Sequence, residues 1–259
     1  MNNKVMITKT NILGTEFAVF SREGAAKAVY EGREALSGEY ICFANVHVTV
    51  MAHDTTDYQR ILNDSAYTFA DGAPIARLQR KQGFAYAERV AGPDFITDLI
   101  GLCEPEVGGR NYSHFFYGSS EEVLSLLYSR LSERFPKLRI AGTYSPPYRE
   151  LTAKEDQAVT DMIRKSGADF IWVGLGAPKQ ERWMAAHKGT FSGVMLGVGA
   201  GFDFHAGTVK RAPKSWQKLG LEWLYRLFSD PKRLFKRYLV TNTKFLWYTR
   251  GALGKQEKI

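Results

Sequence analysis

The chain of 259 residues is 44% hydrophobic and 13% aromatic, which is enough apolar material for one sizeable domain, or one domain with an appendage. This composition argues against a disordered chain. The formal net charge of +8 is unevenly placed, because residues 206–259 hold 13 Lys and Arg against 3 acidic residues, whereas residues 1–205 sum to −2. A tail this basic predicts contact with something anionic, such as nucleic acid, anionic lipid or a phosphorylated substrate.

Cysteine use and hydropathy predict the compartment. The two cysteines, Cys42 and Cys103, lie in apolar runs without paired spacing, as expected of buried free thiols in a reducing compartment. The first ten residues have no apolar signal core, and no run approaches the roughly 18 apolar residues of a spanning helix. We therefore expect a protein that is cytosolic or peripheral to a membrane.

Short β-branched or aromatic runs alternate with amphipathic stretches along most of the chain. Two stretches have clear helical periodicity, 120–134 and 152–166, and the second opens with a capping box of Thr152 and Glu155. This alternation predicts an α/β fold with a parallel sheet covered by helices on both faces. The predicted strands are 40–44, 67–70, 113–117, 138–141, 169–173 and 193–196.

From Trp216 onward the pattern is helical only. Asp230 and Pro231 predict a helix start, with a cap and a proline in the first turn. The apolar and basic residues that follow fall on opposite faces, which suits a helix lying on a membrane surface. A C-terminal helix that packs on the core with its charges in solvent explains the same pattern. The apolar set is Leu234, Phe235, Tyr238, Leu239, Phe245 and Leu246, and the basic set is Lys232, Arg233, Lys236, Arg237 and Lys244.

Polar or glycine-rich clusters follow five of the predicted strands. Each alone has a simpler explanation, since a glycine after a strand often serves a turn, and Asp71 could cap the next helix. Together they predict one face built to hold a polar ligand, because ligands of parallel sheets gather at the carboxyl ends of the strands. The clusters are Asn45 with His47, Asp71 with Gly72, 118–120, 174–181 and 197–201.

Several motifs are missing from the sequence. It contains neither a complete G-x-G-x-x-G nor a Walker P-loop, which argues against a dinucleotide oxidoreductase and a P-loop NTPase. The five histidines have no metal-ligand spacing, and there is no Asp-x-Asp of the kind that holds a divalent metal in many sugar transferases. We therefore expect no metal and no other cofactor. If a diphosphate is the leaving group, Arg and Lys side chains must stabilise its charge.

Several blocks of the sequence occur in a fixed order that is similar to one known family. They begin with Phe-Ala-Asn45-Val-His47, Phe-Ala-Asp71-Gly72 and Glu88-Arg89-Val-Ala-Gly92-Pro-Asp94. The later blocks are Gly176-Ala-Pro-Lys179-Gln180-Glu181, the run from Gly197 through Gly199 and Asp203 to Gly207, Lys210-Arg211-Ala-Pro213, Leu221-Glu222-Trp223-Leu-Tyr225-Arg226 and Asp230-Pro231-Lys-Arg233. On these blocks the chain resembles the WecG/TagA/CpsF family, glycosyltransferase family 26, from about residue 11 to about residue 246.

The resemblance implies metal-independent, inverting transfer of a sugar from a UDP-sugar to an undecaprenyl-diphosphate-linked sugar. Such enzymes serve teichoic acid, capsule, exopolysaccharide or enterobacterial common antigen synthesis. It also implies a Rossmann-like catalytic core, 1–205, and a basic helical appendage, 206–259, that docks on an anionic membrane. The expected location is cytoplasmic, peripheral on the inner face of the bacterial plasma membrane. The oligomeric state is left open, and a homo-oligomer is compatible with the resemblance.

The resemblance also assigns roles to residues. Asp71 matches the proposed catalytic base, and Gln180 belongs to the same pocket. The appendage positions expected to hold the lipid diphosphate are Arg226, Arg233, Lys236 and Arg237. The remaining positions expected to bind substrate, taken from the matched blocks and the strand ends, are Asn45, His47, Gly72, Arg89, Gly92, Gly118, Gly176, Lys179, Gly199, Asp203 and Arg211.

Two departures and two alternatives complete the prediction. Relatives often carry Thr where this chain has Phe43, which removes a hydroxyl near the base, and the stretch 144–148 differs from the family pattern.

A nucleic-acid-binding protein is one alternative function. It would explain the sequence pI of 9.4 and the basic, aromatic tail, but no nucleic-acid motif is present. A membrane-binding module without catalysis would leave Asp71 and Gln180 unexplained.

Overall fold

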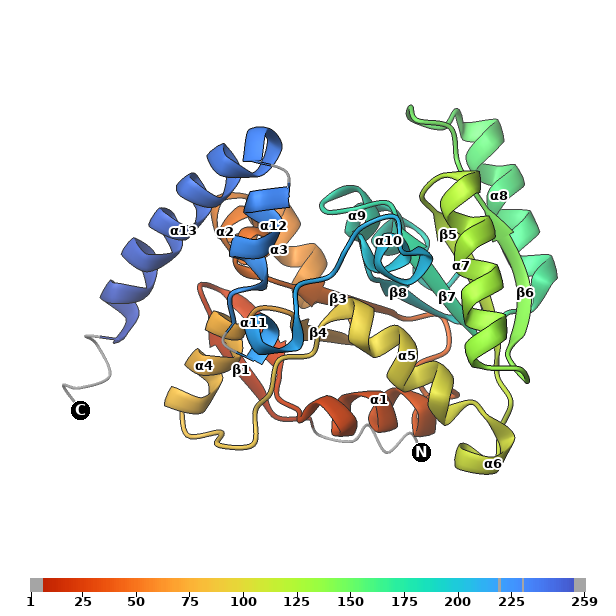
Figure 1. The fold of residues 1–259 in the computed structure, drawn as a ribbon, viewed down its shortest axis with the longest axis horizontal. Helices are drawn as coiled ribbons and strands as arrows, with labels where there is room; N and C mark the ends of the chain where they lie inside the picture. Colours follow the sequence, from red (N-terminus) through yellow and green to blue (C-terminus); the bar gives the residue numbers. More distant parts are fainter. Residues whose placement is uncertain (1–6, 219, 230, 254–259) are drawn as a thin grey trace.

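A computed structural model describes residues 7–218, 220–229 and 231–253, without the side chains of 214, 218, 226, 229, 233, 237 and 251–253. Its centre is a six-stranded sheet in the order β4-β3-β8-β7-β5-β6, in which every neighbouring pair is parallel (Figure 1). All six predicted strands are present, with small shifts at their ends. They are β3 Tyr40–Ala44, β4 Tyr67–Ala70, β5 Ser113–Gly118, β6 Arg139–Tyr144, β7 Phe170–Gly174 and β8 Val194–Gly197.

Alternation along the strands assigns their side chains to two apolar layers. In β3, Ile41 and Phe43 join the layer beneath α1, α5, α7 and α10, whereas Tyr40, Cys42 and Ala44 join the layer beneath α2, α3, α8 and α9. Strands buried on both faces need helices on both faces, which confirms the predicted α/β class. These helices are α1 Arg22–Glu31, α2 Val46–Asp54, α3 Thr56–Asn63, α5 Gly92–Leu102, α7 Glu121–Arg134, α8 Ala153–Ser166, α9 Lys179–Ala186 and α10 Gly201–Ala206.

Local capping signals begin the two long helices where the sequence predicts. The Ser120 hydroxyl accepts a hydrogen bond from the Val123 amide at the start of α7. At the start of α8 the capping box is formed, because Thr152 accepts from the Glu155 amide and the Glu155 carboxylate accepts from the Thr152 amide. Each cap satisfies amides that the first helical turn leaves unpaired.

A two-stranded antiparallel hairpin, β1 Lys9–Ile12 and β2 Thr15–Ala18, precedes the sheet and was not predicted. Its two-residue turn places Leu13 at φ 54° and Gly14 at φ 84°, the twist that suits a tight hairpin. Gln79 of α4, Ala73–Lys81, donates to the Thr10 hydroxyl at 3.1 Å and so ties the hairpin to the core. One further short helix, α6, spans Pro105–Gly108.

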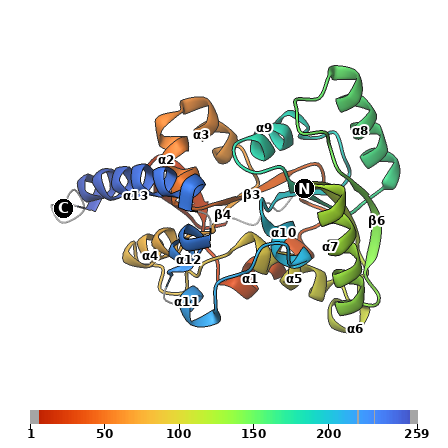
Figure 2. The same cartoon turned by 45° about the horizontal axis from the view of Figure 1, so that its top comes forward.

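Three helices follow the core: α11 Lys214–Lys218, α12 Glu222–Ser229 and α13 Pro231–Leu253. Helix α13 runs beside α2, as both ribbon views show (Figure 2). It starts at Pro231 as predicted, while the predicted cap Asp230 lies outside the described residues. Because α10 still packs between α5 and α7, the chain leaves the core only after Ala206. The division into a catalytic core and a docking appendage remains a prediction about function.

Candidate active site

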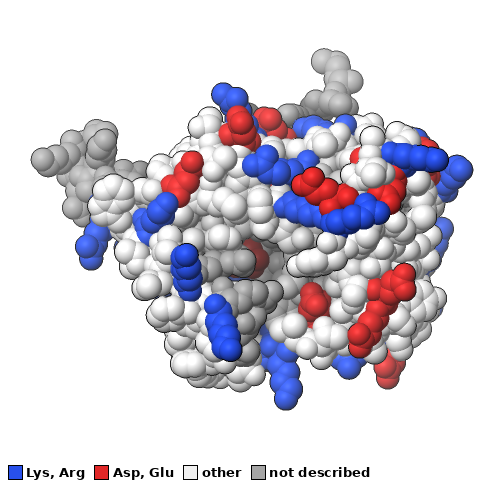
Figure 3. Space-filling view, turned by 90° about the horizontal axis from the view of Figure 1, so that it is seen from above, with Lys and Arg blue, Asp and Glu red and all other residues white. Residues whose placement is uncertain are grey.

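The carboxyl ends of β3 and β4 open into a cavity of about 450 Å³ that α12 and α13 close from the other side. Seen from above, the surface is hollowed near its middle, with acidic and basic side chains around the hollow (Figure 3). The core lines the cavity with Asn45, Val46, His47, Asp71, Gly72, Ala73, Pro74, Arg77 and Arg89. The C-terminal part lines it with Gly220, Glu222, Trp223, Tyr238, Asn242, Phe245 and Leu246.

Asp71 lies at the end of β4 with its side chain 20% exposed to this cavity. Its amide donates to the Ala44 carbonyl of β3 at 3.1 Å, which fixes the backbone at the strand end. The N-cap of α4 is Gly72, which has no side chain that could cap the helix.

Arg89 holds Asp71 from the loop before α5. Its Nε donates to the Asp71 carbonyl at 3.0 Å, and its Nη2 lies 3.5 Å from Asp71 Oδ1. The same Nη2 lies 2.9 Å from Oε2 of Glu222, the first residue of α12. Burial opposes the charge of Arg89, but the two carboxylates outweigh burial and raise the pKa of this guanidinium. Arg89 thus joins the core to the C-terminal helices at the cavity.

Arg211 forms ion pairs with Asp94 and Glu222, on the side of Glu222 away from Arg89 and the cavity. It binds both carboxylate oxygens of Asp94 at 2.6 and 2.7 Å, and its Nε lies 3.5 Å from Glu222 Oε1. Burial opposes ionisation of Asp94, yet the bonds and charge of Arg211, with Arg22 and Arg89 nearby, lower the pKa of that carboxyl. Arg211 is therefore held within the protein, not directed into the cavity.

Asn45 and His47 reach the same cavity from the end of β3. The Asn45 carboxamide oxygen accepts from the Val48 amide at 3.2 Å and caps α2, so this residue has a structural bond as well as a place in the lining. A Cβ on Gly72 would lie only 3.5 Å from Asn45 Cα, which places the two strand ends against one another. The structure thus brings Asn45, His47, Asp71 and Gly72 together at one cavity.

The resemblance places Gln180 in the same pocket as Asp71, but in the structure its carboxamide lies between the loops that follow β7 and β8. Its side chain is buried, and its carboxamide oxygen accepts from the amides of Gly176 at 3.1 Å and Gly199 at 3.0 Å. Its nitrogen donates to the Gly197 carbonyl at 2.9 Å and to Glu181 at 2.7 Å. Gln180 therefore clamps together the glycine loops that follow β7 and β8, and it is not among the residues that line the cavity.

Glu181 sets the orientation of that clamp. Its carboxylate accepts from the Tyr58 hydroxyl at 3.0 Å as well as from Gln180, and it is fully buried. Burial raises the pKa of Glu181, although both hydrogen bonds favour the ionised form. A carboxylate that accepts from the Gln180 nitrogen leaves the Gln180 oxygen pointing at the two glycine amides.

The other predicted positions lie along the strand ends, apart from the cavity. A Cβ on Gly118 would come 2.6 Å from the Gly174 carbonyl carbon, and one on Gly92 would come 3.1 Å from the Val198 oxygen, so both glycines allow close backbone packing. Lys179 is exposed at the start of α9, with its Nζ 3.5 Å from the Arg149 carbonyl. Asp203 is half-buried in the first turn of α10.

Of the four predicted phosphate-binding residues, Lys236 has a described side chain. The side chains of Arg226, Arg233 and Arg237 lie outside the described part of the structure, and Lys236 is exposed on α13. Lys244 instead forms an ion pair with Asp54 of α2, Nζ to Oδ2 at 2.6 Å, and Tyr248 donates to the same carboxylate at 2.8 Å. These contacts fasten α13 onto the core.

Helix α13 has apolar side chains on two sides. Leu234 and Phe245 are buried against the rest of the protein, as a packing helix requires. Phe235, Leu239 and Trp247 are 59%, 58% and 72% exposed. The packing explanation therefore holds for one side of the helix, and the membrane-surface explanation stays a prediction about the other. Within the described residues, no helix combines the length and apolar character needed to cross a membrane.

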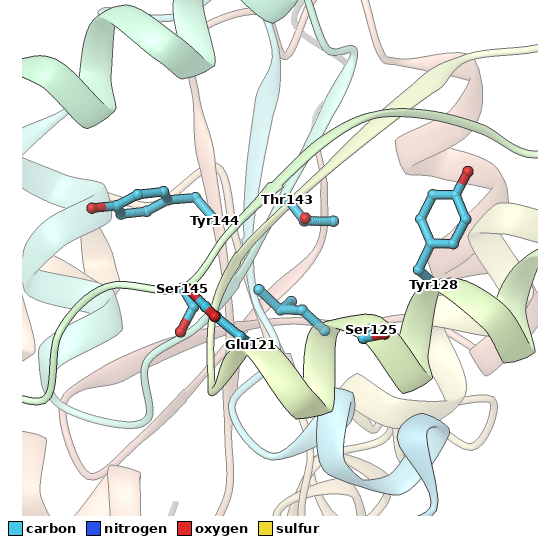
Figure 4. Close-up of a pocket in the computed structure, with 7 residues that line it drawn as sticks. Glu121, Ser125, Tyr128, Thr143, Tyr144 and Ser145 are labelled. Atoms are coloured by element: carbon cyan, nitrogen blue, oxygen red, sulfur yellow. The ribbon is translucent and has the colours of Figure 1, made fainter.

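A second hollow, of about 370 Å³, lies between α7 and β6. Its lining comprises Glu121, Leu124, Ser125, Tyr128, Thr143, Tyr144 and Ser145, and Figure 4 shows these side chains around the opening. The only charged group among them is the carboxylate of Glu121, which would repel a diphosphate. The first cavity, with Asp71 and Arg89, is therefore the better candidate for chemistry on a phosphorylated substrate.

Sequence reasoning missed the residues that complete the site from the C-terminal side. Glu222 and Trp223 lie in a block that carries the family resemblance, but no role was assigned to either. Tyr238 was assigned only to the apolar face of its helix, yet it lines the cavity and its ring lies 5.8 Å from that of Trp223.

Phe43, which stands where relatives often have Thr, belongs to the core. Its ring centroid lies 5.0 Å from that of Phe95, and the residue does not line the cavity. Among the described residues, no group of three His, Cys, Asp or Glu side chains could hold a metal ion.

Comparison with known proteins identifies the family. The sequence model described as "Glycosyl transferase WecG/TagA/CpsF family" matches residues 10–258. A relative from Staphylococcus aureus (strain MW2) is 28% identical over 87% of both chains, and one from Bacillus spizizenii is 32% identical over 76% of this chain and 73% of its own length. Both are named N-acetylglucosaminyldiphosphoundecaprenol N-acetyl-beta-D-mannosaminyltransferase. These matches do not favour the nucleic-acid-binding alternative. The chain belongs to the WecG/TagA/CpsF family and is a glycosyltransferase.

Proposed function

We propose that this enzyme transfers N-acetylmannosamine from its UDP derivative to an N-acetylglucosamine linked to undecaprenyl diphosphate, inverting the anomeric centre without a metal. The sugar and the acceptor are taken from the names of the relatives, which describe this transfer for those proteins. The observation that carries the proposal is the cavity in which Asp71 and Arg89 face Trp223 and Tyr238 of the C-terminal helices. It brings a carboxylate, a cation and aromatic side chains together around one cavity.

In the proposed reaction Asp71 takes the proton from the attacking hydroxyl of the acceptor sugar. The hydroxyl oxygen forms a bond to the anomeric carbon while the bond from that carbon to the diphosphate oxygen breaks, and UDP leaves. One displacement on an α-linked donor gives a β-linked product, in agreement with the "beta" in the relatives' names. The charge that develops on UDP requires cations, and the exposed Arg77 at the cavity with the basic C-terminal helices would supply them.

We also propose that the enzyme works peripherally on the inner face of the plasma membrane. The acceptor named for the relatives carries an undecaprenyl chain, which resides in a bilayer. The exposed apolar side of α13 adjoins exposed Lys232 and Lys236, a combination suited to an anionic lipid surface.

A transfer assay tests the proposal. Purified protein is incubated in EDTA with a panel of UDP-sugars and a short-chain lipid-diphosphate N-acetylglucosamine, and the products are identified by mass spectrometry. We expect a disaccharide product with the N-acetylmannosamine donor in EDTA, and a β linkage by NMR. Transfer of another sugar would correct the donor, and activity only with added Mg²⁺ or Mn²⁺ would refute the metal-independent reaction. The same panel without protein is the control.

A further inference from the structure

Glu222 lies between two arginines of the core. It is the first residue of α12, and its side chain is only 11% exposed. Its Oε2 lies 2.9 Å from Arg89 Nη2, and its Oε1 lies 3.5 Å from Arg211 Nε. A carboxylate buried to this degree needs cationic partners, because the loss of hydration is otherwise uncompensated. The start of α12 is therefore bound to the core by charge.

Arg89 shares one nitrogen between Glu222 and Asp71. Its Nη2 is 2.9 Å from the Glu222 carboxylate but 3.5 Å from that of Asp71, so the closer pairing is with Glu222. Arg211 cannot easily replace Arg89 in this pairing, since both oxygens of Asp94 already hold its terminal nitrogens. The charge of Arg89 is thus divided between a carboxylate of the core and one of the C-terminal helices.

We propose that Glu222 is a positioning residue, which draws the charge of Arg89 away from Asp71 and keeps Asp71 a stronger base while α12 is docked. This inference rests on the proposed function, in which Asp71 is the catalytic base. A cation beside a carboxylate favours its ionised form and weakens it as a base, and a second carboxylate on the same cation opposes that effect. Docking of the helix that helps to enclose the acceptor would then also set the strength of the base.

Other ionisable groups line the cavity together with Asp71. His47, Arg77 and Tyr238 line the same cavity, from α2, α4 and α13. Replacement of Glu222 leaves these groups chemically unchanged, so a change in the titration of Asp71 reports the loss of the Glu222 charge. Asp54 provides a matched control, because it accepts hydrogen bonds from Lys244 and Tyr248 of α13, away from the Arg89 pairing.

The test compares Glu222→Gln and Asp54→Asn in the full chain. The Asp71 carboxyl is followed by carbon-13 NMR during a pH titration with labelled aspartate, and its signal is assigned with Asp71→Asn. Glu222→Gln should lower the titration midpoint of Asp71 by about half a pH unit or more, while Asp54→Asn leaves it in place. In the transfer assay Glu222→Gln should lower kcat by about three- to tenfold with little change in KM, and should move the acidic limb of the kcat profile to lower pH.

Several outcomes would overturn the inference. An unchanged Asp71 midpoint in Glu222→Gln means that Glu222 does not act on the base. An equal fall in Asp54→Asn means that loose docking, and not the charge on Arg89, is responsible. If Glu222→Gln does not fold, Glu222→Asp keeps the charge one methylene farther away and should give a smaller fall, and no fall would count against the inference. A protein that transfers no sugar would refute the proposed function alone, since the NMR titration needs no substrate.

Discussion

Polar residues at the strand ends of this enzyme have distinct physical roles despite their similar places in the sequence. Asn45 caps α2, and Gln180 clamps two glycine loops with every polar atom of its carboxamide used inside the protein. Asp71 lines the cavity beside Arg89, whose Nη2 lies 3.5 Å from its carboxylate. Among these three, only Asp71 combines an acid–base group with a place in the cavity lining, and it is therefore the group to replace first.

Replacement of Asp71 should therefore separate activity from stability. Asp71→Asn keeps the size of the side chain but removes its basicity, so kcat should fall by about 10²–10⁴-fold. The melting temperature should change little, because Asn has nearly the same size as Asp and accepts hydrogen bonds from helix N-terminal amides about as well. Steady-state kinetics and thermal unfolding measure the two effects. Asp57→Asn, in an exposed pair with Arg60, is the matched control, and near-normal turnover by Asp71→Asn would rule out the assigned base.

Among the elements, the sequence predicts those whose signals are local. The six sheet strands are short buried runs of β-branched and aromatic residues, and the capping box of α8 is complete within four residues. The hairpin of β1 and β2 was missed because its turn lacks Asn-Gly or Asp-Gly and is held from α3, where Gln59 donates to the Leu13 carbonyl at 3.0 Å. A bond between residues 46 positions apart leaves no periodic trace in the sequence.

The part of the site that lies at the strand ends was likewise predictable from local sequence signals, whereas the part that depends on distant contacts was not. Asn45 and Asp71 follow adjacent strands, and the expectation that strand-end clusters converge identified that side of the cavity correctly. The pairing of Arg89 with Glu222 depends on how α12 returns to the core, which no local pattern encodes. The exposed and buried sides of α13 were also beyond prediction, because periodicity alone does not tell which apolar residues find a partner.

The ion pair between Asp94 and Arg211 fastens the segment before α11 to α5, and its contribution should depend on pH. Because folding lowers the pKa of Asp94, its stabilising effect is complete above the unfolded pKa, about 3.9, and is lost as the pH falls through the folded value. Asp94→Asn should lower the free energy of unfolding by about 2 kcal/mol at pH 7. The difference should hold down to about pH 5 and shrink below about pH 4.

Urea unfolding of the full chain at pH 7, 5 and 3.5 measures this dependence. Asp161→Asn is the control, because Asp161 forms an exposed pair with Arg164 that should contribute little at any pH. A stability difference for Asp94→Asn that stays the same at pH 3.5 would show that its origin is packing and not the charge of the pair.

At the scale of the whole molecule, the C-terminal helices both close the cavity and carry an apolar surface. Trp223, Tyr238 and Phe245 face inward to the cavity, while Phe235, Leu239 and Trp247 are exposed. If the cavity receives the proposed lipid-linked acceptor, these exposed apolar side chains on the adjacent helix would let membrane contact and acceptor capture occur together. The basic residues alone would give a weaker, salt-sensitive attachment.

Membrane binding should therefore depend on the exposed apolar side of α13. The triple variant Phe235→Ser, Leu239→Ser, Trp247→Ser removes large apolar side chains that contribute little to packing, so the fold should persist. Burial of each of these side chains in a bilayer interface would stabilise binding by roughly 1.5–3 kcal/mol. The triple variant should therefore bind anionic liposomes at least about tenfold more weakly in a co-sedimentation assay.

The control is Tyr86→Ser with Val107→Ser, which removes comparably exposed apolar groups away from α13 and should leave binding unchanged. Raised salt should further weaken binding of the triple variant, whose attachment would rest on Lys232, Lys236 and other basic residues. Equal sedimentation of the triple variant and the unmodified chain would return α13 to a packing role alone.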